Sequence, residues 1–365
     1  MKKYRAAVIG LGWMGMLYDL APRSKKRFHI DDVNRPTPTL DIHRHTHHRI
    51  RPNREGNPTS YCDALHNCPK VELISAADRD PKRLKIFNQR YGIDATYTDA
   101  EQMLKELNPE IVAVATNTKH RADLTCLAVE CGAKAIMTEK PMAHTLEEVD
   151  RMVNTCSEAC VPLSCGSIST THASFEIAKR LLRNGHIGKL LSIETGNVFA
   201  QHQNWSYFLD KLPEWVVGIG DEHRRESGSN EFVGQGFAWS NDFAVHFRKG
   251  SSGVRITGDT GELVFDFENG WRLWKDVETD NNTQGRAQLP WPKPNFNVPY
   301  GAVYCLDDLL RCLAGELDEP KNSGRRVGIA IEVELALKES STQGGNRIDL
   351  PLQNRGLGLH YDWFR

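Results

Sequence analysis

The feature that most constrains this fold is the segment VIGLGWMG near the start of the chain, which follows a short run of small and apolar residues. Such a run is typical of a strand covered on both faces. We expect Gly10 to permit a tight turn, Gly12 to let the backbone approach a pyrophosphate, and Gly15 to allow close packing of the next helix. That helix would present its first free N–H groups, around Trp13 and Met14, to phosphate oxygens. The segment therefore predicts a dinucleotide-binding site.

An acidic residue should follow such a fingerprint about 20 residues on, to hold the adenosine ribose, but a basic, histidine-rich stretch occupies that place. The next strand-like run, VELISAAD, ends in Asp78 and is followed by Arg79 and a helix-forming segment. A carboxylate at this strand end can accept hydrogen bonds from both ribose hydroxyls and would repel a 2′-phosphate. We therefore predict that Asp78 and Arg79 belong to the cofactor site and that NAD is favoured over NADP.

The long separation of Asp78 from the glycines indicates an insertion in the first crossover, from about residue 21 to residue 58. A short helix GMLYDL would precede the insertion, and a resumed helix SYCDALHNC would lead into the second strand. Surface loops tolerate such insertions because the entropy of loop closure grows slowly with length. Strand and helix patterns then alternate to about residue 166, which predicts a parallel, doubly wound sheet.

Lys and Arg outnumber Asp in the predicted insertion, although the whole chain has 46 Lys and Arg against 47 Asp and Glu. Long irregular loops in compact domains are usually functional lids or disordered segments, and we favour a lid over the cofactor or the substrate. Four clustered histidines could bind a metal, but their tight spacing favours a solvated or anion-binding loop, and no metal site is predicted. These histidines are His43, His45, His47 and His48.

Length, charge and cysteine content limit the class of protein. A chain of 365 residues is long enough for two domains. Its net charge of -1 gives no overall field that would attract nucleic acid or an anionic membrane. The nine cysteines include no Cys-x-x-Cys pair, which favours buried reduced thiols. Since neither an apolar run of about 18 residues nor a leader is present, we expect a cytoplasmic, unanchored protein without nucleic-acid or membrane partners.

The triplet EKP, residues 139–141, lies at the end of the fifth expected strand. With RNGHIGKLLSIE, ITGDTGELVFD and SGRRVGIAIEVELALKESSTQGGNRIDLPL in the second half, the chain resembles the Gfo/Idh/MocA family, which contains glucose-fructose oxidoreductase and inositol dehydrogenases. The resemblance implies a Rossmann domain over residues 1–166 and a second α/β domain over residues 167–365, with an open, mainly antiparallel sheet. It also implies NAD(P) held between the domains and a homodimer or homotetramer formed through that sheet.

Lys140 is the first candidate catalytic residue. A lysine at a strand end beside the nicotinamide can hydrogen-bond the hydroxyl that is oxidised and stabilise the developing alkoxide. The resemblance implies that Lys140 contacts substrate and takes part in proton transfer, with a cis-like turn at Pro141; the alternative is a surface lysine paired with Glu139. Where the family has Thr-Pro-Asn-x-x-His, this chain has TNTKHR. We expect Thr116, Asn117 and Glu139 to complete the cofactor site.

The second catalytic signature of the family, Asp-x-Gly-x-His, is incomplete in this chain. His202 lies in the corresponding segment and is the expected general acid or base, but a valine stands in place of the aspartate four residues upstream. A further hypothesis gives this role to His47 or His48 of the insertion. In TNTKHR, Arg121 stands where the family pattern has its histidine, and His120 lies one place earlier. These departures predict a substrate pocket rebuilt relative to better-known members.

Together these features predict an NAD-dependent oxidoreductase that transfers hydride between the cofactor and a secondary alcohol of a sugar, polyol or sugar-derived acid. A second hypothesis is an enzyme that uses tightly held NAD transiently, oxidising a sugar hydroxyl, eliminating or hydrolysing at the neighbouring carbon, and reducing again. A third is a nucleotide-binding sensor or scaffold whose catalytic residues are lost, which the incomplete Asp-x-Gly-x-His motivates.

Overall fold

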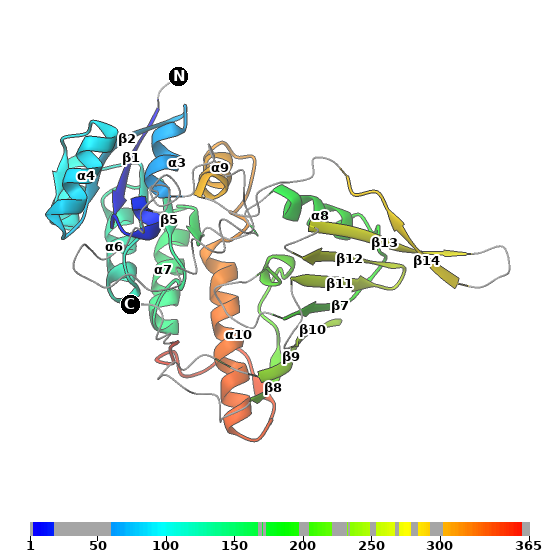
Figure 1. The fold of residues 1–365 in the computed structure, drawn as a ribbon. Coiled ribbons are helices and arrows are strands. Elements are labelled where there is room, and N and C mark those ends of the chain that lie inside the picture. The colour runs from blue at the N-terminus through cyan, green and yellow to red at the C-terminus, as the bar shows by residue number, and fades with distance from the viewer. Residues whose placement is uncertain are drawn as a thin grey trace, which may run out of the picture. The chain divides into compact units, whose positions relative to one another are not determined.

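The computed structural model of the protein describes its structure over most of the chain, in two compact units that each contain a sheet (Figure 1). The first unit comprises residues 1–143, 148–171 and 300–324, and the second comprises residues 144–147, 172–299 and 325–365. The predicted insertion and its histidine cluster lie outside the described residues. The described residues are 3–17, 60–166, 170, 173–196, 204–220, 232, 234–248, 253–266, 270–278, 284–292 and 302–359.

The first unit is built on a parallel sheet. Its described strands are β1 (Tyr4–Ile9), β2 (Val71–Ala77), β3 (Thr96–Tyr97), β4 (Ile111–Val114), β5 (Ala135–Thr138) and β6 (Leu163–Cys165). They lie in the order β3-β2-β1-β4-β5-β6, with every pairing parallel. The order reverses between β1 and β4, and ligands of such sheets bind at the carboxyl ends of the strands near this point. The predicted doubly wound Rossmann sheet is confirmed.

Helices with sequence-encoded ends connect these strands. For example, the Asp80 carboxylate accepts a hydrogen bond from the Lys82 N–H at 2.9 Å at the start of one helix, and Gly92 ends that helix with a φ of 68°. The described helices of this unit are η1 (Trp13–Leu17), α3 (Tyr61–Asn67), α4 (Pro81–Tyr91), α5 (Ala100–Leu107), η3 (Thr118–His120), α6 (Arg121–Glu130), most of α7 (Leu146–Glu158) and α9 (Ala302–Leu313). Helices η1 and α3 flank the predicted insertion, as the sequence analysis expects.

Helix α9 joins the first unit although it lies far along the chain. It packs against α3, and Cys305, Leu306 and Leu309 belong to the same buried cluster as the core residues of β1. The boundary expected near residue 166 assigns this segment to the second domain, whereas residues 300–324 cluster with the first. Residues 302–313 cluster with the first unit because the apolar face of α9 packs on α3 and on the sheet strands β5 and β6.

The second unit contains a larger, mixed sheet. Its described strands are β7 (Leu190–Thr195), β8 (Trp215–Gly220), β9 (Gly234–Ser240), β10 (Phe243–Phe247), β11 (Val254–Gly258), β12 (Gly261–Asp266), β13 (Gly270–Glu278), β14 (Gln284–Leu289) and β15 (Ile348–Asp349). Their order is β14-β13-β12-β11-β7-β10-β9-β8-β15. Among these pairings β7 and β10 run parallel and the rest antiparallel. The expected mainly antiparallel second sheet is therefore confirmed.

One face of this sheet forms the core of the second unit. Buried side chains alternate along its strands, as at Ile256 of β11 and at Leu263 and Phe265 of β12. The Phe175 ring packs edge-on against the Trp271 ring, with 5.1 Å between centroids. Among the described residues, the helices that lie entirely in this unit or nearly so are α8 (Ala173–Arg183), η6 (Ser206–Phe208) and α10 (Gly324–Thr342).

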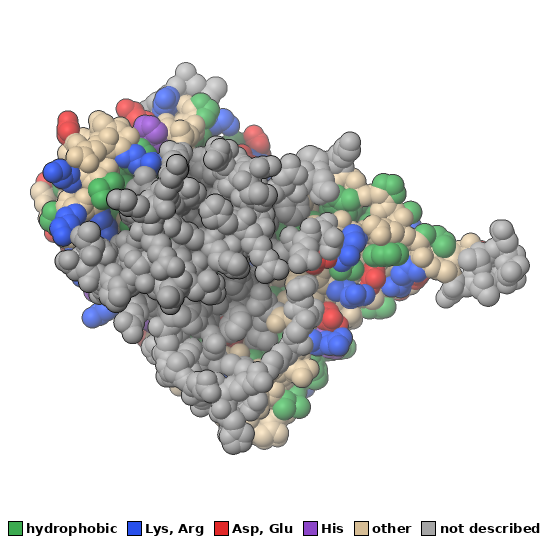
Figure 2. All heavy atoms as spheres, in the orientation of Figure 1, with side chains coloured by type: hydrophobic (Ala, Val, Ile, Leu, Met, Phe, Trp, Pro, Cys, Tyr) green, Lys and Arg blue, Asp and Glu red, His purple; other side chains and the backbone are tan. Residues whose placement is uncertain are grey.

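The surface of the described residues is mixed in charge. On the visible face, Lys and Arg side chains are interspersed with Asp and Glu side chains (Figure 2). On the second sheet, Arg255 pairs with Glu262 at 2.8 Å and Arg286 pairs with Asp276 at 2.9 Å. None of the described helices combines the length and apolar character needed to cross a membrane.

A buried ion pair links α9 to the segment that follows it. The Lys321 ammonium contacts the Asp308 carboxylate, and the Lys321 N–H donates to the same carboxylate at 3.0 Å. Asp308 is 0% exposed, and burial raises the pKa of its carboxyl group while Lys321 opposes this rise. Removing one partner from such a pair leaves an uncompensated buried charge.

We predict that Lys321→Met lowers the free energy of unfolding of the first unit by about 3–5 kcal/mol. The double variant Asp308→Leu/Lys321→Met should recover most of this loss, because no charge is then left buried. Chemical denaturation followed by circular dichroism measures both changes. A single variant as stable as the wild type would contradict the prediction.

Candidate functional site

The glycine fingerprint forms a tight loop at the carboxyl end of β1. Gly10 has a φ of 91°, in the left-handed region that glycine adopts without strain, and its N–H donates to the Ala77 carbonyl at 2.8 Å. A Cβ on Gly15 would lie 1.9 Å from the Gly10 carbonyl oxygen. A side chain at position 15 would therefore push the following turn away from the strand.

The turn η1 begins immediately after Gly12. The N–H groups of Met16 and Leu17 both donate to the Gly12 carbonyl at 3.0 Å. The first residues of a helical turn have N–H groups without acceptors inside the turn, which makes them candidate phosphate donors. In this turn those residues include Trp13 and Met14.

Asp78 lies against the glycine loop despite the long separation in sequence. Its Oδ2 accepts a hydrogen bond from the Leu11 N–H at 2.6 Å, and its Oδ1 accepts one from the Asp80 N–H at 2.8 Å. The Arg83 guanidinium lies 3.6 Å from the same carboxylate, and Arg79 is exposed beside it. The carboxyl ends of β1 and β2 thus form one cradle.

The loop after β4 completes this edge of the sheet. A Cβ on Gly10 would lie 2.9 Å from the Ala115 carbonyl group, so the two loops are in close contact. Thr116 and Asn117 follow, with the Thr116 hydroxyl donating to the Asn117 carbonyl at 3.0 Å. Both side chains are at least partly exposed, which leaves them accessible to a ligand.

The EKP triplet forms the turn after β5, and its Lys140–Pro141 peptide bond is cis. Glu139 is 5% exposed, so it lies in the interior and not on the surface. Its Oε2 accepts a hydrogen bond from the Lys140 N–H at 3.0 Å. Burial lowers the pKa of Lys140, and the Glu139 carboxylate opposes this effect. A lysine with a lowered pKa is suited to exchange a proton at moderate pH.

Two further buried residues, Tyr61 and Arg121, contact this turn, and neither was predicted from the sequence as a site residue. The Tyr61 hydroxyl lies 2.8 Å from Glu139 Oε1, and the Arg121 guanidinium donates to the Glu139 carbonyl at 2.8 Å. Arg121 could have been singled out because it lies in the TNTKHR segment. No sequence pattern points to Tyr61, which follows the predicted insertion directly.

The remaining sequence predictions are distributed as follows. His202, the second catalytic candidate, lies outside the described residues, as do the histidines of the insertion. The predicted cofactor residues within the described part lie in loops at the carboxyl ends of parallel strands, which share one edge of the sheet. They are Gly10, Gly12, Trp13, Met14, Gly15, Asp78, Arg79, Thr116, Asn117, Glu139 and Lys140.

Comparison with known families agrees with this geometry. A family model described as "Oxidoreductase family, NAD-binding Rossmann fold" (GFO_IDH_MocA) matches residues 58–167. The first unit is thus an NAD-binding Rossmann domain. Over these residues the match agrees with the resemblance to the Gfo/Idh/MocA family predicted from the sequence. The match begins after the insertion, and the glycine loop precedes it.

Individual relatives match over parts of their length. D-apiose dehydrogenase of Paraburkholderia graminis is 34% identical over 129 residues, which are 35% of this chain and 34% of that protein. Glycosyl hydrolase family 109 protein 1 of Bacteroides thetaiotaomicron is 24% identical over 259 residues, 65% of this chain and 53% of that protein. The chain therefore spans about a third to about half of the length of these relatives.

Solved structures share the fold. The WlbA dehydrogenase of Bordetella pertussis, crystallised with NADH and UDP-GlcNAcA, superposes with a TM-score of 0.62 and 17% sequence identity. The superposition covers 96% of this chain and 100% of that one. At this identity the comparison establishes the architecture of both units.

We predict that Gly15→Ala weakens NADH binding at least about tenfold, because the added Cβ would displace the loop from the pyrophosphate position. Fluorescence titration with NADH measures the affinity. Gly92→Ala is the matched control: its Cβ meets nothing within 4 Å, and its cost of about 1 kcal/mol falls on stability alone. Equal NADH affinity in the two variants would refute the prediction.

Proposed function

We propose that this protein is an NAD-dependent oxidoreductase that acts on a secondary alcohol of a sugar, polyol or sugar-derived acid. The observation that carries the proposal is the cradle formed by the glycine loop and Asp78, on the same sheet edge as Lys140. A Cβ at Gly10 would lie 2.9 Å from the Ala115 carbonyl group and a Cβ at Gly15 would lie 1.9 Å from the Gly10 carbonyl oxygen, so both positions need glycine for the loop to keep this shape. Asp78 presents a carboxylate beside the loop, and this combination of backbone N–H groups and a carboxylate fits a dinucleotide.

Each residue of the cradle has a role in this proposal. The loop N–H groups around Gly12, Trp13 and Met14 bind the pyrophosphate. Asp78 accepts hydrogen bonds from the adenosine ribose hydroxyls and repels a 2′-phosphate, which favours NAD over NADP. Thr116 and Asn117 contact the cofactor from the end of β4. Bound NAD supplies the hydride acceptor for alcohol oxidation, and NADH supplies the donor for the reverse reaction.

Lys140 moves the proton in this mechanism. Its neutral amine accepts the proton of the substrate hydroxyl as hydride leaves the same carbon, and the resulting ammonium stabilises charge that develops on the oxygen. In carbonyl reduction the ammonium returns that proton. His202 is the proposed second acid or base, although the aspartate that would orient it is a valine in this chain.

We further propose that the protein forms a homodimer or homotetramer through the sheet of the second unit. Trp215, Val217 and Ile219 alternate along one face of β8, and Ile219 is 71% exposed. Apolar groups in this position favour association with another sheet. Light scattering coupled to gel filtration measures the assembly state.

The test of the enzymatic proposal is a panel of sugars, polyols and sugar acids assayed for NADH formation. We predict that Lys140→Met lowers kcat by about 100- to 10,000-fold on any substrate found, a much larger effect than any change in NADH affinity. Turnover by Lys140→Met at the wild-type rate would exclude Lys140 from proton transfer.

The pH dependence of alcohol oxidation provides a separate prediction. Oxidation requires the neutral amine, so kcat/KM should rise with pH and level off above the pKa of Lys140, which burial places below its ordinary value. The Glu139 carboxylate raises this pKa. Glu139→Gln should therefore move the rising limb to lower pH, and a shift to higher pH would contradict the proposed electrostatics.

The similarity to a glycosyl hydrolase family 109 protein favours a second candidate function. This candidate is an enzyme that uses tightly held NAD transiently. A sugar hydroxyl would be oxidised, the neighbouring carbon would undergo elimination or hydrolysis, and the carbonyl would be reduced again. Release of nitrophenol from p-nitrophenyl glycosides without net NADH would support this reaction over the first. NADH binding without turnover on either panel would overturn both in favour of a non-catalytic nucleotide-binding protein.

A further inference from the structure

The turn that carries Lys140 is held by two buried side chains from different helices. Tyr61 is the first residue of α3, and Arg121 is the first residue of α6. Tyr61 is 0% exposed and Arg121 is 1% exposed. Neither is among the predicted cofactor or catalytic residues, yet both contact the segment from Thr138 to Pro141.

Tyr61 connects to Lys140 through a chain of hydrogen bonds. Its hydroxyl lies 2.8 Å from Glu139 Oε1 and 3.0 Å from the Thr138 carbonyl oxygen. Glu139 Oε2 accepts the Lys140 N–H at 3.0 Å. Burial and the nearby Glu139 raise the pKa of Tyr61 well above its ordinary value, so it remains a neutral donor. Both oxygens of the Glu139 carboxylate are thereby engaged.

Arg121 holds the backbone on both sides of Lys140. Its Nη1 donates to the carbonyl oxygens of Glu139 and Pro141, and its Nη2 donates to the Thr116 carbonyl. The planar guanidinium can serve several carbonyl groups at once, which the single ammonium of a lysine cannot do in the same geometry. The fork also ties the turn after β5 to the cofactor loop after β4.

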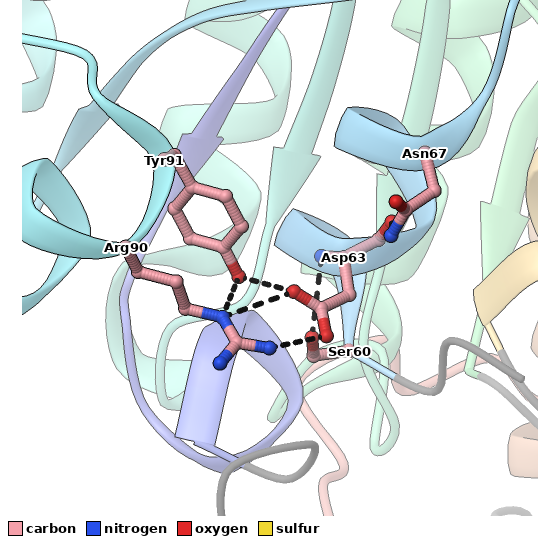
Figure 3. Close-up of polar contacts among 5 residues, drawn as sticks. All are labelled: Ser60, Asp63, Asn67, Arg90 and Tyr91. Atoms are coloured by element: carbon pink, nitrogen blue, oxygen red, sulfur yellow. Dashed lines mark hydrogen bonds and ion pairs between the residues drawn. The ribbon is translucent and has the colours of Figure 1, made fainter. Parts of the chain in front are cut away.

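The helix that carries Tyr61 is itself fixed at a second point (Figure 3). The Asp63 carboxylate accepts two hydrogen bonds from Arg90, at 3.2 Å from Nε and 2.6 Å from Nη2, and a third from the Tyr91 hydroxyl at 2.6 Å. These contacts join α3 to α4. The Tyr61 hydroxyl is therefore presented to Glu139 from a helix that these contacts anchor to α4.

We propose that Tyr61 and Arg121 are positioning residues that act on Lys140 through this turn, by fixing its backbone and the charges that surround its side chain. The inference rests on the proposed proton-transfer role of Lys140. Because neither residue is required to touch substrate or cofactor, their effect on the reaction would be transmitted by the turn.

The charges around Lys140 come from several elements and have opposite effects. Glu139 on the same turn raises the pKa of Lys140, and Arg121 from α6 lowers it. Cys165 from β6 also faces this site, but burial raises the pKa of its thiol well above the ordinary value, so it is neutral. Removing the Arg121 charge should therefore raise the pKa of Lys140.

The first experiment measures Lys140 directly by an NMR pH titration of full-length protein labelled with 13Cε-lysine, with Lys140→Met to assign the signal. Arg121→Met should shift the Lys140 titration to higher pH. Arg121→Lys keeps the positive charge but loses the simultaneous hydrogen bonds to the carbonyl groups of Thr116, Glu139 and Pro141. It should therefore shift the Lys140 titration less than Arg121→Met and still lower kcat. An unshifted Lys140 titration in Arg121→Met overturns the role of Arg121. If Arg121→Met does not fold, a wild-type kcat in Arg121→Lys overturns it instead.

The second experiment is a double-mutant cycle on kcat with Tyr61→Phe and Glu139→Gln. Tyr61→Phe should lower kcat about tenfold through misplacement of the reacting group and leave NADH affinity within about twofold. In the Glu139→Gln background the same change should have little further effect, because the two variants remove one shared interaction. Additive losses would overturn the role of Tyr61.

Tyr97→Phe is the matched control, since it also removes a tyrosine hydroxyl that donates to a carboxylate, that of Glu106 at 2.9 Å, between β3 and α5 and not at α3 or the Lys140 turn. It should leave kcat unchanged, whereas Tyr61→Phe lowers it; a loss of kcat equal to that of Tyr61→Phe would overturn the inference. The NMR readout needs no substrate, so a shifted titration without turnover on any panel would refute the proposed function and retain the positioning role.

Discussion

The hydrogen bond from the Leu11 N–H to the Asp78 carboxylate, at 2.6 Å, is the contact on which the proposed cofactor site depends. It joins the carboxyl ends of β1 and β2, next to the point between β1 and β4 where the sheet order reverses, and it fixes the glycine loop against β2. The other predicted cofactor residues follow β1, β2, β4 and β5. Parallel strands present their carboxyl ends at one edge, so this long-range bond ties together two of the loops that share that edge.

The chemistry of Lys140 depends on a different balance, between burial and charge. An amine in the interior prefers its neutral form, and the adjacent carboxylate opposes that preference while a buried guanidinium reinforces it. Neutral hydrogen-bonding partners hold these charges in place, so the proton affinity of the lysine follows from packing. In the proposed function Lys140 retains the family pattern, whereas the sequence around His202 departs from it.

Much of the fold was predictable because it depends on local patterns. Continuous apolar runs predict buried strands, and the glycines predict a tight loop that packs closely against its neighbours. Together with a carboxylate at a strand end, these patterns identify the Rossmann sheet and the position of Asp78. Contacts between distant segments were not predictable. Tyr61 reaches Glu139 only after the chain returns from the insertion, and the three carbonyl partners of Arg121 belong to two loops. The placement of α9 depends on which core its apolar face completes, and no pattern within the helix itself encodes that choice.

The position of α9 has a consequence for how the protein is made. The first unit is discontinuous: its last core helix comes from residues 302–313, after the strands β7 to β14 of the second unit. During synthesis the nucleotide-binding unit cannot finish its core until the ribosome has translated most of the polypeptide. A fragment cut after residue 166 would lack α9 and would leave apolar groups of α3, β5 and β6 without their cover, so the first unit completes its core only after most of the second unit has been synthesised.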